Sequence, residues 1–361
     1  MREMEAYLAQ RIRTTGPITL ADYMGDCLMH PDHGYYQQER IFGADGDFIT
    51  APEISQMFGE MIGLWLANRW QAMGAPTRIN LIELGPGRGT LMADVLASTR
   101  SVAGFHDALT VHFLELSEQL RAEQKKAVPS ATWHSSLATI PNGPVLVVAN
   151  EFFDALPIHQ FEFKDGIWFE RSVTLDGDEN LKMVLTEPSA KLALVPEHLR
   201  KPKGNAVVEV SPASIGIMRD IGDRLNNDGG AALIIDYGYD HANFGDSFQA
   251  VKDHRYCDAL TAPGKADITA HVNFESLKRM AMDAGLQVGG PTGQGQFLMQ
   301  LGLGSRASAL VKGKSEEQHA EVFSALKRLT APDEMGTLFR VLSVTDIDQE
   351  PAPGFLVGNG S

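Results

Sequence analysis

A short apolar run, three alternating glycines and a helical pattern follow one another in this chain of 361 residues. The run Ile79–Leu84 is typical of a buried strand, and Thr90–Thr99 has the apolar period of a helix. Between them, Gly85, Gly87 and Gly89 allow a sharp turn, because only glycine lets a backbone approach a ligand without a Cβ in the way. A helix behind such a turn offers free N–H groups and the positive end of its dipole. The stretch therefore predicts a site for a nucleotide-like cofactor.

The spacing of these glycines distinguishes between classes of cofactor. A dinucleotide-binding turn has the pattern G-x-G-x-x-G, and its third glycine position is Thr90 in this chain. The pattern present is an acidic residue, Glu83, followed by G-x-G-x-G with Pro86 after the first glycine. This pattern resembles motif I of S-adenosylmethionine (SAM) methyltransferases. An ordinary glycine-rich loop is the alternative that these ten residues leave open.

Strand-like and helix-like segments alternate from residue 78 onward. The predicted strands are Ile79–Leu84, Thr110–Leu116, Thr132–His134, Val145–Asn150, Val207–Val210, Ala231–Asp236, Ser247–Val251, Leu286–Gly289 and Phe297–Leu301. The predicted helices of this part are Thr90–Thr99, Ser117–Ala127, Ala213–Asn226 and Asn273–Ala284. Short apolar strands that alternate with helices predict an α/β fold, with a mostly parallel sheet covered by helices on both faces. Such a sheet binds ligands beyond the carboxyl ends of its strands.

Additional segments flank this predicted core. Helices are expected over residues 4–13, Thr19–Met29 and Glu53–Met73, and a β-hairpin turning at Asp165-Gly166 is expected between Gln160 and Leu175. A further helix is expected over Ala320–Thr330. The predicted organisation is an N-terminal accessory segment (1–76), a core (77–302) with an insertion at about 157–206, and a C-terminal extension (303–361).

Composition narrows the classes of partner. The formal charge of −15 argues against a nucleic-acid-binding surface, which needs a basic footprint. Cys27 and Cys257 have no metal-ligand spacing, so we expect a reducing compartment and no metal. The longest apolar runs are of strand length, and no membrane span is expected. The first residues lack an apolar signal core, which favours a bacterial-type cytoplasm.

Glu115 closes the second predicted strand of the core. An acidic side chain at this position can accept hydrogen bonds from the ribose hydroxyls of a bound nucleoside, as in dinucleotide-binding folds. The alternative is a solvent-facing carboxylate at the end of a strand. Together with the glycine turn, Glu115 predicts a ribose contact.

The stretch Val147–Pro157 holds a second group of polar side chains. A buried strand ends in Asn150, Glu151 and Asp154, and two phenylalanines lie among them. In a parallel sheet of this type, this strand end faces the methyl group that is transferred. A carboxylate such as Glu151 can hold a guanidinium in a bidentate pair and align its nitrogen. Capping and turn roles are the alternative, and they suit Asp154 better than Glu151.

A polar loop precedes the long predicted helix of the N-terminal segment. Thr50 and Glu53 have the spacing of a capping box, and Pro52 lies between them near the helix start. Helix capping explains these residues as structure. We also expect the loop that contains Thr50 and Pro52 to cover the cofactor, and the two roles are compatible.

Blocks along nearly the whole chain resemble one family, the MidA-like proteins, which include the mitochondrial complex I assembly-factor protein-arginine methyltransferase. The blocks are Gly46–Glu60, Leu81–Asp94, Ala149–Phe161, Glu209–Pro212, Ala232–Tyr239, Pro263–Phe274, Gln294–Leu298 and Met335–Leu342. The resemblance implies a class I SAM-dependent methyltransferase (Rossmann-like) fold. For the mitochondrial member it implies dimethylation of an arginine in a core subunit of NADH–ubiquinone oxidoreductase.

The resemblance also assigns roles to residues of this chain. Gly85, Gly87 and Gly89 are expected at the amino-acid end of the cofactor, Glu115 at its ribose, and Asn150 and Glu151 near the methyl group. The cofactor is SAM, with S-adenosylhomocysteine as the product, and the partner is a protein substrate. Three alternatives remain at this stage: a small-molecule methyltransferase, a SAM-binding assembly chaperone with little catalytic activity, and a dinucleotide oxidoreductase, which Thr90 at the third glycine position opposes.

Overall fold

The computed structural model describes residues 3–37, 50–252, 254–346 and 351–355. The chain divides into two compact units. The first unit comprises Met1–Phe48, Phe153–Ile217 and His241–Asn273, and the second comprises Ile49–Phe152, Met218–Asp240 and Phe274–Ser361. The N-terminal helices and the inserted hairpin region, separate additions in the sequence, therefore belong to one unit.

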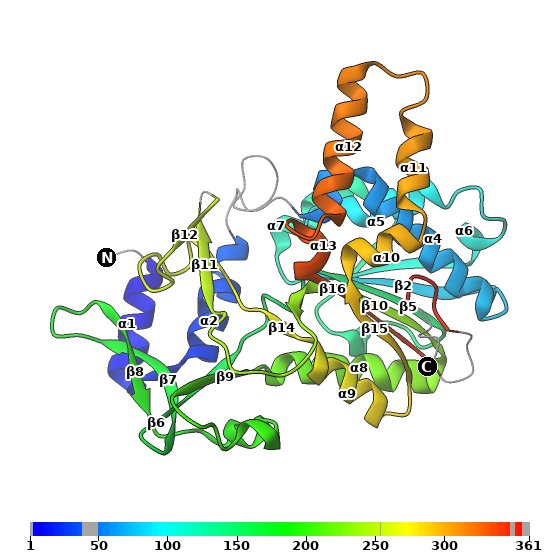
Figure 1. Cartoon of the computed structure of the whole chain (residues 1–361). Coiled ribbons are helices and arrows are strands. Elements are labelled where there is room, and N and C mark those ends of the chain that lie inside the picture. Colours follow the sequence, from blue (N-terminus) through cyan, green and yellow to red (C-terminus); the bar gives the residue numbers. More distant parts are fainter. Residues whose placement is uncertain (1–2, 38–49, 253, 347–350, 356–361) are drawn as a thin grey trace. The chain divides into compact units, whose positions relative to one another are not determined.

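The second unit contains the large sheet. Its strands lie in the order β15–β16–β10–β5–β2–β3–β4 (Figure 1). Their bounds are β2 (Ile79–Leu84), β3 (Leu109–Leu114), β4 (Thr132–His134), β5 (Val145–Asn150), β10 (Gly230–Tyr239), β15 (Gln287–Gly293) and β16 (Phe339–Thr345). Neighbours from β10 to β4 pair in parallel, whereas β16 is antiparallel to both β10 and β15. The prediction of a mostly parallel sheet is confirmed.

The strand order reverses direction between β2 and β5. From β2 the chain moves to β3 and β4 on one side, and it then returns to β5 on the other side of β2. In register, Leu84 lies beside Leu114 and Ala149, and Ile235 lies beside Asn150. The carboxyl ends of β2, β3, β5 and β10 therefore meet at one edge. A ligand site is expected at this edge, where the connections diverge.

Helices cover both faces of the sheet (Figure 1). The helices of this unit are α3 (Ala51–Ile54), α4 (Gln56–Ala72), α5 (Thr90–Ser98), α6 (Phe105–Ala108), α7 (Glu118–Ala127), α9 (Phe274–Asp283), α10 (Gln294–Gln300), α11 (Leu303–Leu310), α12 (Glu316–Thr330) and α13 (Met335–Leu338). Helix α8 (Pro212–Asp228) carries residues of both units.

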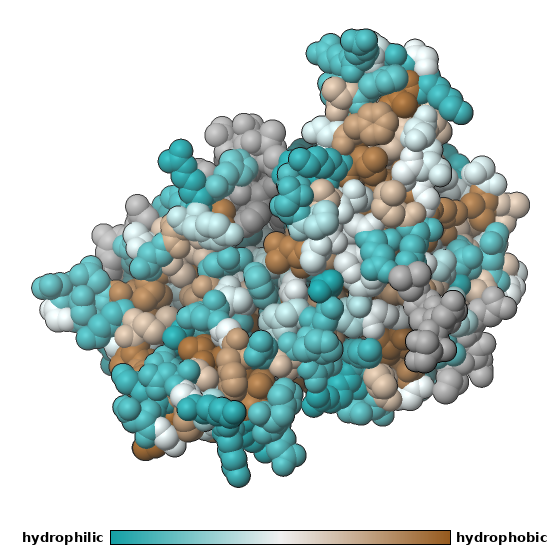
Figure 2. All heavy atoms as spheres, in the orientation of Figure 1, coloured by the Kyte–Doolittle hydropathy of each residue, from teal (hydrophilic) through white to brown (hydrophobic). Residues whose placement is uncertain are grey.

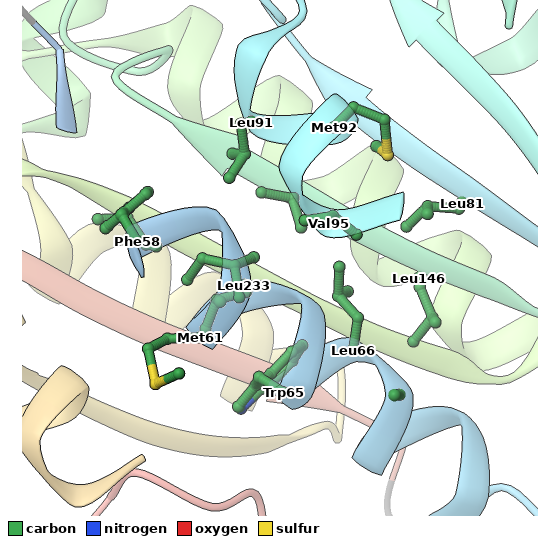
Figure 3. Packing of buried hydrophobic residues seen from close by; sticks show 14 of the residues in the cluster. Phe58, Met61, Trp65, Leu66, Leu81, Leu91, Met92, Val95, Leu146 and Leu233 are labelled. Atoms are coloured by element: carbon green, nitrogen blue, oxygen red, sulfur yellow. The ribbon is translucent and has the colours of Figure 1, made fainter. Parts of the chain in front are cut away.

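The core between one face of the sheet and helices α4 and α5 is apolar and close-packed (Figure 3). Phe58, Met61 and Trp65 of α4 lie on the same side of the strands as Val95 of α5, and all are buried. Burial of side chains of this size stabilises the fold by about 1.5–3 kcal/mol each, which anchors the turn between β2 and α5 on a rigid base.

Two strands predicted for the core, Val207–Val210 and Ser247–Val251, lie instead in the small sheets of the first unit, as parts of β9 (Ala206–Val210) and β11 (Gln249–Lys252).

Two further predicted elements differ from the structure. The long helix expected over Glu53–Met73 is broken at Ser55, whose extended backbone (φ −164°) lets its hydroxyl cap α4 at the N–H of Met57. The segment Phe297–Leu301, predicted as a strand, belongs to helix α10 and its end. Its apolar residues Phe297 and Leu298 are buried against neighbouring helices, and so short an apolar run does not distinguish a strand from a buried helix.

The first unit contains two small sheets and two N-terminal helices. The larger sheet has the order β1–β7–β6–β9, with β8 paired to β7, and β12–β11–β13 form the other. The elements are α1 (Glu3–Thr15), α2 (Leu20–Met29), β1 (Ile18–Thr19), β6 (His159–Lys164), β7 (Ile167–Leu175), β8 (Leu181–Thr186), β9 (Ala206–Val210), β11 (Gln249–Lys252), β12 (Arg255–Cys257) and β13 (Asp267–Thr269). The predicted hairpin is confirmed, with positive φ at both Asp165 (51°) and Gly166 (85°).

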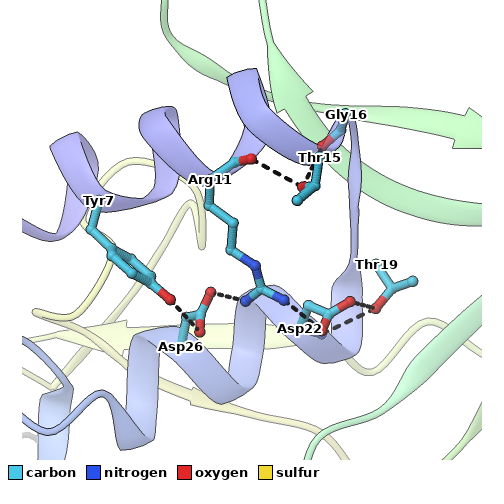
Figure 4. Close-up of polar contacts among 7 residues, drawn as sticks. All are labelled: Tyr7, Arg11, Thr15, Gly16, Thr19, Asp22 and Asp26. Carbon is cyan, nitrogen blue, oxygen red and sulfur yellow. Dashed lines mark hydrogen bonds and ion pairs between the residues drawn. The ribbon is translucent and has the colours of Figure 1, made fainter.

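Polar contacts join the two N-terminal helices. The guanidinium of Arg11 on α1 pairs with Asp22 and Asp26 of α2, and the hydroxyl of Tyr7 donates to Asp26 (Figure 4). Thr19 caps α2 by accepting the N–H of Asp22. These contacts fix the pairing of α1 with α2 within the unit.

Helices α11 and α12 form a hairpin that extends away from the sheet (Figure 1). The face in Figure 2 is hydrophilic at the tip of this hairpin and carries apolar side chains along its length, and Phe323 of α12 is about half exposed. Among the described residues, no helix is both long enough and apolar enough to span a membrane.

Candidate cofactor site

The glycine turn between β2 and α5 uses backbone conformations that favour glycine. Gly85, Gly87 and Gly89 have φ values of 60°, 52° and 81°. A Cβ on Gly85 would lie 2.8 Å from the ring of Phe152, so this position also requires a residue without a side chain. The buried Pro86 contributes its carbonyl, which accepts the N–H of Gly89 at 2.7 Å.

Helix α5 begins directly behind this turn. Gly89 is its N-cap and Thr90 its first residue, and Gly89 makes no side-chain cap. The first N–H groups of the helix therefore point toward the turn with the positive end of the helix dipole. A carboxylate, such as that of an amino-acid group, matches these donors.

Glu83 lies inside the sheet, two residues before the turn. It is 3 % exposed, and burial raises the pKa of its carboxyl from 4.5 to about 8. Among the described residues, its Oε2 has no hydrogen-bond partner. A buried acceptor of this kind is uncommon in a folded protein, and an ammonium group is a donor that would satisfy it.

Glu115 follows β3 and is held by three donors. Its Oε1 accepts the backbone N–H groups of Leu116 and Ser117, both at 2.8 Å, and its Oε2 accepts the amide of Gln124 at 3.0 Å. Burial raises the pKa of the Glu115 carboxyl, and these hydrogen bonds oppose the rise. Since a carboxylate offers about four acceptor directions, the one that remains on Oε2 suits a ribose hydroxyl.

The end of β5 carries a strained residue. Glu151 has φ 50°, the left-handed region that a side chain rarely adopts. Its N–H donates to the carbonyl of Ile235 at 2.9 Å. Its Oε1 accepts the side-chain amide of Asn150 at 3.2 Å and the N–H of Ala51 at 3.1 Å. Backbone strain of this kind clusters at functional sites.

Asn150 is the second residue of this edge with an unsatisfied acceptor. Its side chain is nearly buried, and its Oδ1 has no hydrogen-bond partner among the residues that the structure describes. Because its Nδ2 donates to Glu151, the orientation of the amide is set, and Oδ1 is the atom that a ligand donor would meet.

The predicted capping box at Thr50 is wrong. Thr50 is the N-cap of α3, with Pro52 in the first turn, but its side chain makes no cap hydrogen bond. Instead, the carboxylate of Glu151 caps the helix from another segment by accepting the N–H of Ala51. A four-residue helix leaves little local structure to orient a threonine cap, and the partly exposed carboxylate of Glu151 instead satisfies the first N–H of the helix. The preceding loop residues 46–49 lie outside the described part of the chain.

Asp154 belongs to the first unit, whereas the other predicted site residues belong to the second. Its side chain is 7 % exposed, and its carbonyl accepts the N–H of Ala270 at 3.1 Å. Its proposed catalytic role stays a prediction.

Two further residues of this edge were not predicted from the sequence. Asp236 on β10 is fully buried, and its carboxylate accepts the N–H groups of Phe152 at 3.1 Å and Tyr237 at 2.9 Å. It therefore supports the backbone beside Glu151. Gln124 on α7 lies between the glycine turn and Glu115. The sequence held one signal for Gln124, since it is a polar residue in the apolar stripe of a helix, four residues from both Leu120 and Val128.

These groups fit SAM in their donor and acceptor types. Helix N–H groups match its carboxylate, the unsatisfied acceptors of Glu83 and Asn150 match its ammonium, and Glu115 matches a ribose hydroxyl. In the described part of the chain, no group of three or more His, Cys, Asp or Glu residues is arranged to hold a metal ion.

Comparisons with known proteins give relatives over nearly the whole chain. Residues 61–292 match a family described as putative S-adenosyl-L-methionine-dependent methyltransferases. The mitochondrial protein arginine methyltransferase NDUFAF7 of Danio rerio is 35% identical over 94% of this chain and 86% of its own length. The Drosophila melanogaster homologue is 36% identical over 96% and 87%. A COG1565 superfamily structure from Burkholderia thailandensis, bound to S-adenosylhomocysteine, has a TM-score of 0.85 at 26% identity, covering 97% of this chain and 93% of its own.

Proposed function

Because the chain belongs to this family of SAM-dependent methyltransferases, we propose that it methylates an arginine side chain of a protein. The observation that carries the proposal is the near full-length similarity to enzymes named protein arginine methyltransferases. It is combined with a carboxylate, Glu151, at the edge of the sheet where the carboxyl ends of β2, β3, β5 and β10 meet. The class I fold and the use of SAM follow from the family and from the fold of the S-adenosylhomocysteine-bound relative.

The proposed cofactor site is the carboxyl edge of β2, β3 and β5. Gly85, Gly87, Gly89 and Thr90 would hold the amino-acid end, with Glu83 accepting from its ammonium. Pro86 would hold the turn, and Glu115 would bind the ribose. We propose that Thr50 and Pro52 cover the cofactor, since Glu151 joins the start of their helix to the end of β5. The hydrogen bonds of Glu115 with Gln124 and of Glu151 with Ala51 support the assignment.

Glu151 and Asn150 are proposed to position the acceptor arginine. When bound, SAM supplies a methyl group already activated on a sulfonium sulfur, so the protein needs only to align the acceptor and exclude water. The carboxylate of Glu151 would pair with the guanidinium and keep one nitrogen directed at the methyl carbon. Transfer would form the N–C bond as the C–S bond breaks, and the proton that the methylated nitrogen loses would pass to the carboxylate of Glu151. Asp154 is proposed as a further carboxylate that would accept this proton.

The proposed target is a core subunit of the respiratory NADH–quinone oxidoreductase, and the proposed compartment is the cytoplasm. The arginine specificity rests on the relatives named arginine methyltransferases, and the target on the resemblance of the sequence blocks.

The direct test is transfer of a labelled methyl group to purified oxidoreductase subunits, followed by mass spectrometry of their arginines. We expect a labelled arginine with the wild type. Glu151→Gln should keep S-adenosylhomocysteine binding and lose at least about 100-fold in transfer rate, because the charge pair with the guanidinium is lost. Glu275→Gln, which changes a carboxylate of the exposed α9 pair with Arg279, is the matched control and should transfer normally.

Three outcomes would contradict the proposal. Full transfer by Glu151→Gln would remove its assigned role. Tight binding of S-adenosylhomocysteine without any transfer to the subunits would favour an assembly chaperone, whereas transfer to a small molecule alone would favour a small-molecule methyltransferase.

A further inference from the structure

Helix α7 contacts both parts of the proposed cofactor site through one buried glutamine. Gln124 is fully buried, and its Nε2 donates to the carbonyl of Gly87 at 2.8 Å and to Oε2 of Glu115 at 3.0 Å. Its Oε1 accepts the indole N–H of Trp133 at 2.7 Å. Three partners therefore surround one side-chain amide.

The orientation of this amide is unambiguous. The carbonyl of Gly87 and the carboxylate of Glu115 only accept hydrogen bonds, and the indole of Trp133 only donates. Turning the amide by 180° would place an acceptor against two acceptors and a donor against a donor. The three contacts consequently hold both Nε2 hydrogens in place.

The same helix packs against the rest of the glycine turn. A Cβ on Gly89 would lie 3.3 Å from Cβ of Ala127 and 3.5 Å from Cα of Gln124. Arg88, between the glycines, lies 3.4 Å from a carboxylate oxygen of Glu123. The backbone carbonyl of Glu115 accepts from the guanidinium of Arg121. Successive turns of α7 thus meet the glycine turn and the strand end that carries Glu115.

We propose that Gln124 is a positioning residue for SAM, which fixes the carboxylate of Glu115 relative to the glycine turn. This inference rests on the proposed cofactor site. The turn would hold the amino-acid end of SAM and Glu115 its ribose, and the amide links the two before the ligand arrives. Such preorganisation strengthens binding because the ligand does not have to order these groups. A glutamate in place of Gln124 would put a carboxylate against Glu115 and the Gly87 carbonyl while still accepting from Trp133.

Calorimetric titration with S-adenosylhomocysteine tests the proposal. We expect Gln124→Glu and Gln124→Leu to bind about 10- to 100-fold more weakly than the wild type, since each loses two hydrogen bonds that order the site. Gln294→Glu is the matched control, because Gln294 is also fully buried and donates its Nε2 to a backbone carbonyl, that of Leu329. This control should lose stability but keep its affinity.

A second measurement separates positioning from a loss of stability. Glu115→Ala should weaken binding about tenfold in the wild type but only about twofold in the Gln124→Leu background, because Glu115 is no longer held in place there. The indole ¹H–¹⁵N signal of Trp133, identified by its absence in Trp133→Phe, should remain one sharp signal in Gln124→Glu and move downfield, because its acceptor changes from an amide oxygen to a carboxylate. A sharp signal that has moved shows a folded site with a changed charge.

The failures of the two proposals are distinguishable. If Gly87→Val, which forces a side chain at φ 52°, binds as tightly as the wild type, the cofactor site is misplaced. If Gly87→Val loses binding but both Gln124 variants bind normally, or if the effects of Gln124→Leu and Glu115→Ala simply add, the positioning role of Gln124 is refuted.

Discussion

Two buried carboxylates, Glu83 in the second unit and Glu209 in the first, differ in how they are satisfied. Glu209 accepts the amide of Gln160 at 2.7 Å and the N–H of Ser247 at 2.9 Å on Oε1, and the Ser247 hydroxyl on Oε2. Glu83 has an oxygen with no partner among the described residues. Burial raises the pKa of both carboxyls, to about 8 in the case of Glu83, and donors oppose the rise only at Glu209.

The difference indicates what each region does. A fully satisfied buried network stabilises one arrangement of its elements, and the protein gains from it without any ligand. A buried acceptor without a donor destabilises the folded protein, and the fold alone gives no reason for it. A ligand that supplies the donor would explain why such an acceptor is present. Glu83 and Asn150 are two such acceptors, and both lie at the carboxyl edge of the large sheet, where we propose that SAM binds.

The largest effect is expected at the glycine turn. Gly85→Val should weaken S-adenosylhomocysteine binding more than about 100-fold, because its Cβ would meet the ring of Phe152 at 2.8 Å in a strained backbone. Gly74 is the control, since it also has positive φ (80°) but no atom within 4 Å of the position that a Cβ would take. Gly74→Val should share the backbone strain without the steric clash, and it should keep full affinity in the same titration. Equal affinities of the two variants for S-adenosylhomocysteine would show that the glycine turn does not bind the cofactor.

The next effect concerns the satisfied network of the first unit. Glu209→Ala should lower the free energy of unfolding by about 2–4 kcal/mol, because Gln160 and Ser247 lose a buried charged acceptor. Urea denaturation measures this loss, and the folded variant should bind S-adenosylhomocysteine with unchanged affinity. A loss of affinity at normal stability would show that the network of Glu209 belongs to the ligand site. It would contradict the proposed difference between Glu209 and Glu83.

Glu83 should make stability depend on pH in the opposite sense to a paired carboxylate. In the unfolded chain this group ionises near pH 4.5, whereas the folded chain holds its proton up to about pH 8. The contribution of Glu83 to stability is therefore most favourable below pH 4.5 and falls as the pH rises to about 8, by at most about 1.4 kcal/mol per pH unit. Glu83→Gln removes this dependence, so urea denaturation should show its advantage over the wild type growing between pH 5 and 7.5. An advantage that is the same at both pH values would contradict the raised pKa.

The smallest effect is expected for an exposed ion pair. Arg279 and Glu275 lie 2.6 Å apart on α9, and the Arg279 side chain is 55 % exposed. Arg279→Ala should change the free energy of unfolding by no more than about 0.5 kcal/mol, because solvent screens such a pair. A loss above about 1 kcal/mol in urea would show that burial is not what separates important charges from unimportant ones in this molecule.

Local patterns predicted much of the edge. The strand β2, the glycine turn and the start of α5 form a contiguous stretch, and their apolar period and glycine content indicate them directly. The hairpin at Asp165-Gly166 was equally local, because its turn chemistry is carried by those two residues.

What the sequence did not predict depends on contacts between distant segments. The cap of α3 comes from Glu151, 100 residues away from Ala51, so the Thr50 spacing was misleading. The support that Asp236 gives to Phe152 and the contacts of Gln124 with Gly87 likewise join separate strands and helices. No local pattern contains such partners.

Proton release on cofactor binding tests the central claim most directly. Calorimetric titration with S-adenosylhomocysteine at pH 7, in two buffers of different ionisation enthalpy, measures it. If the ammonium of the ligand meets Glu83, whose pKa is about 8 in the free protein, binding should ionise this carboxyl and release up to about one proton, and Glu83→Gln should release none. Equal proton release by the wild type and Glu83→Gln would contradict the placement of the cofactor at this edge.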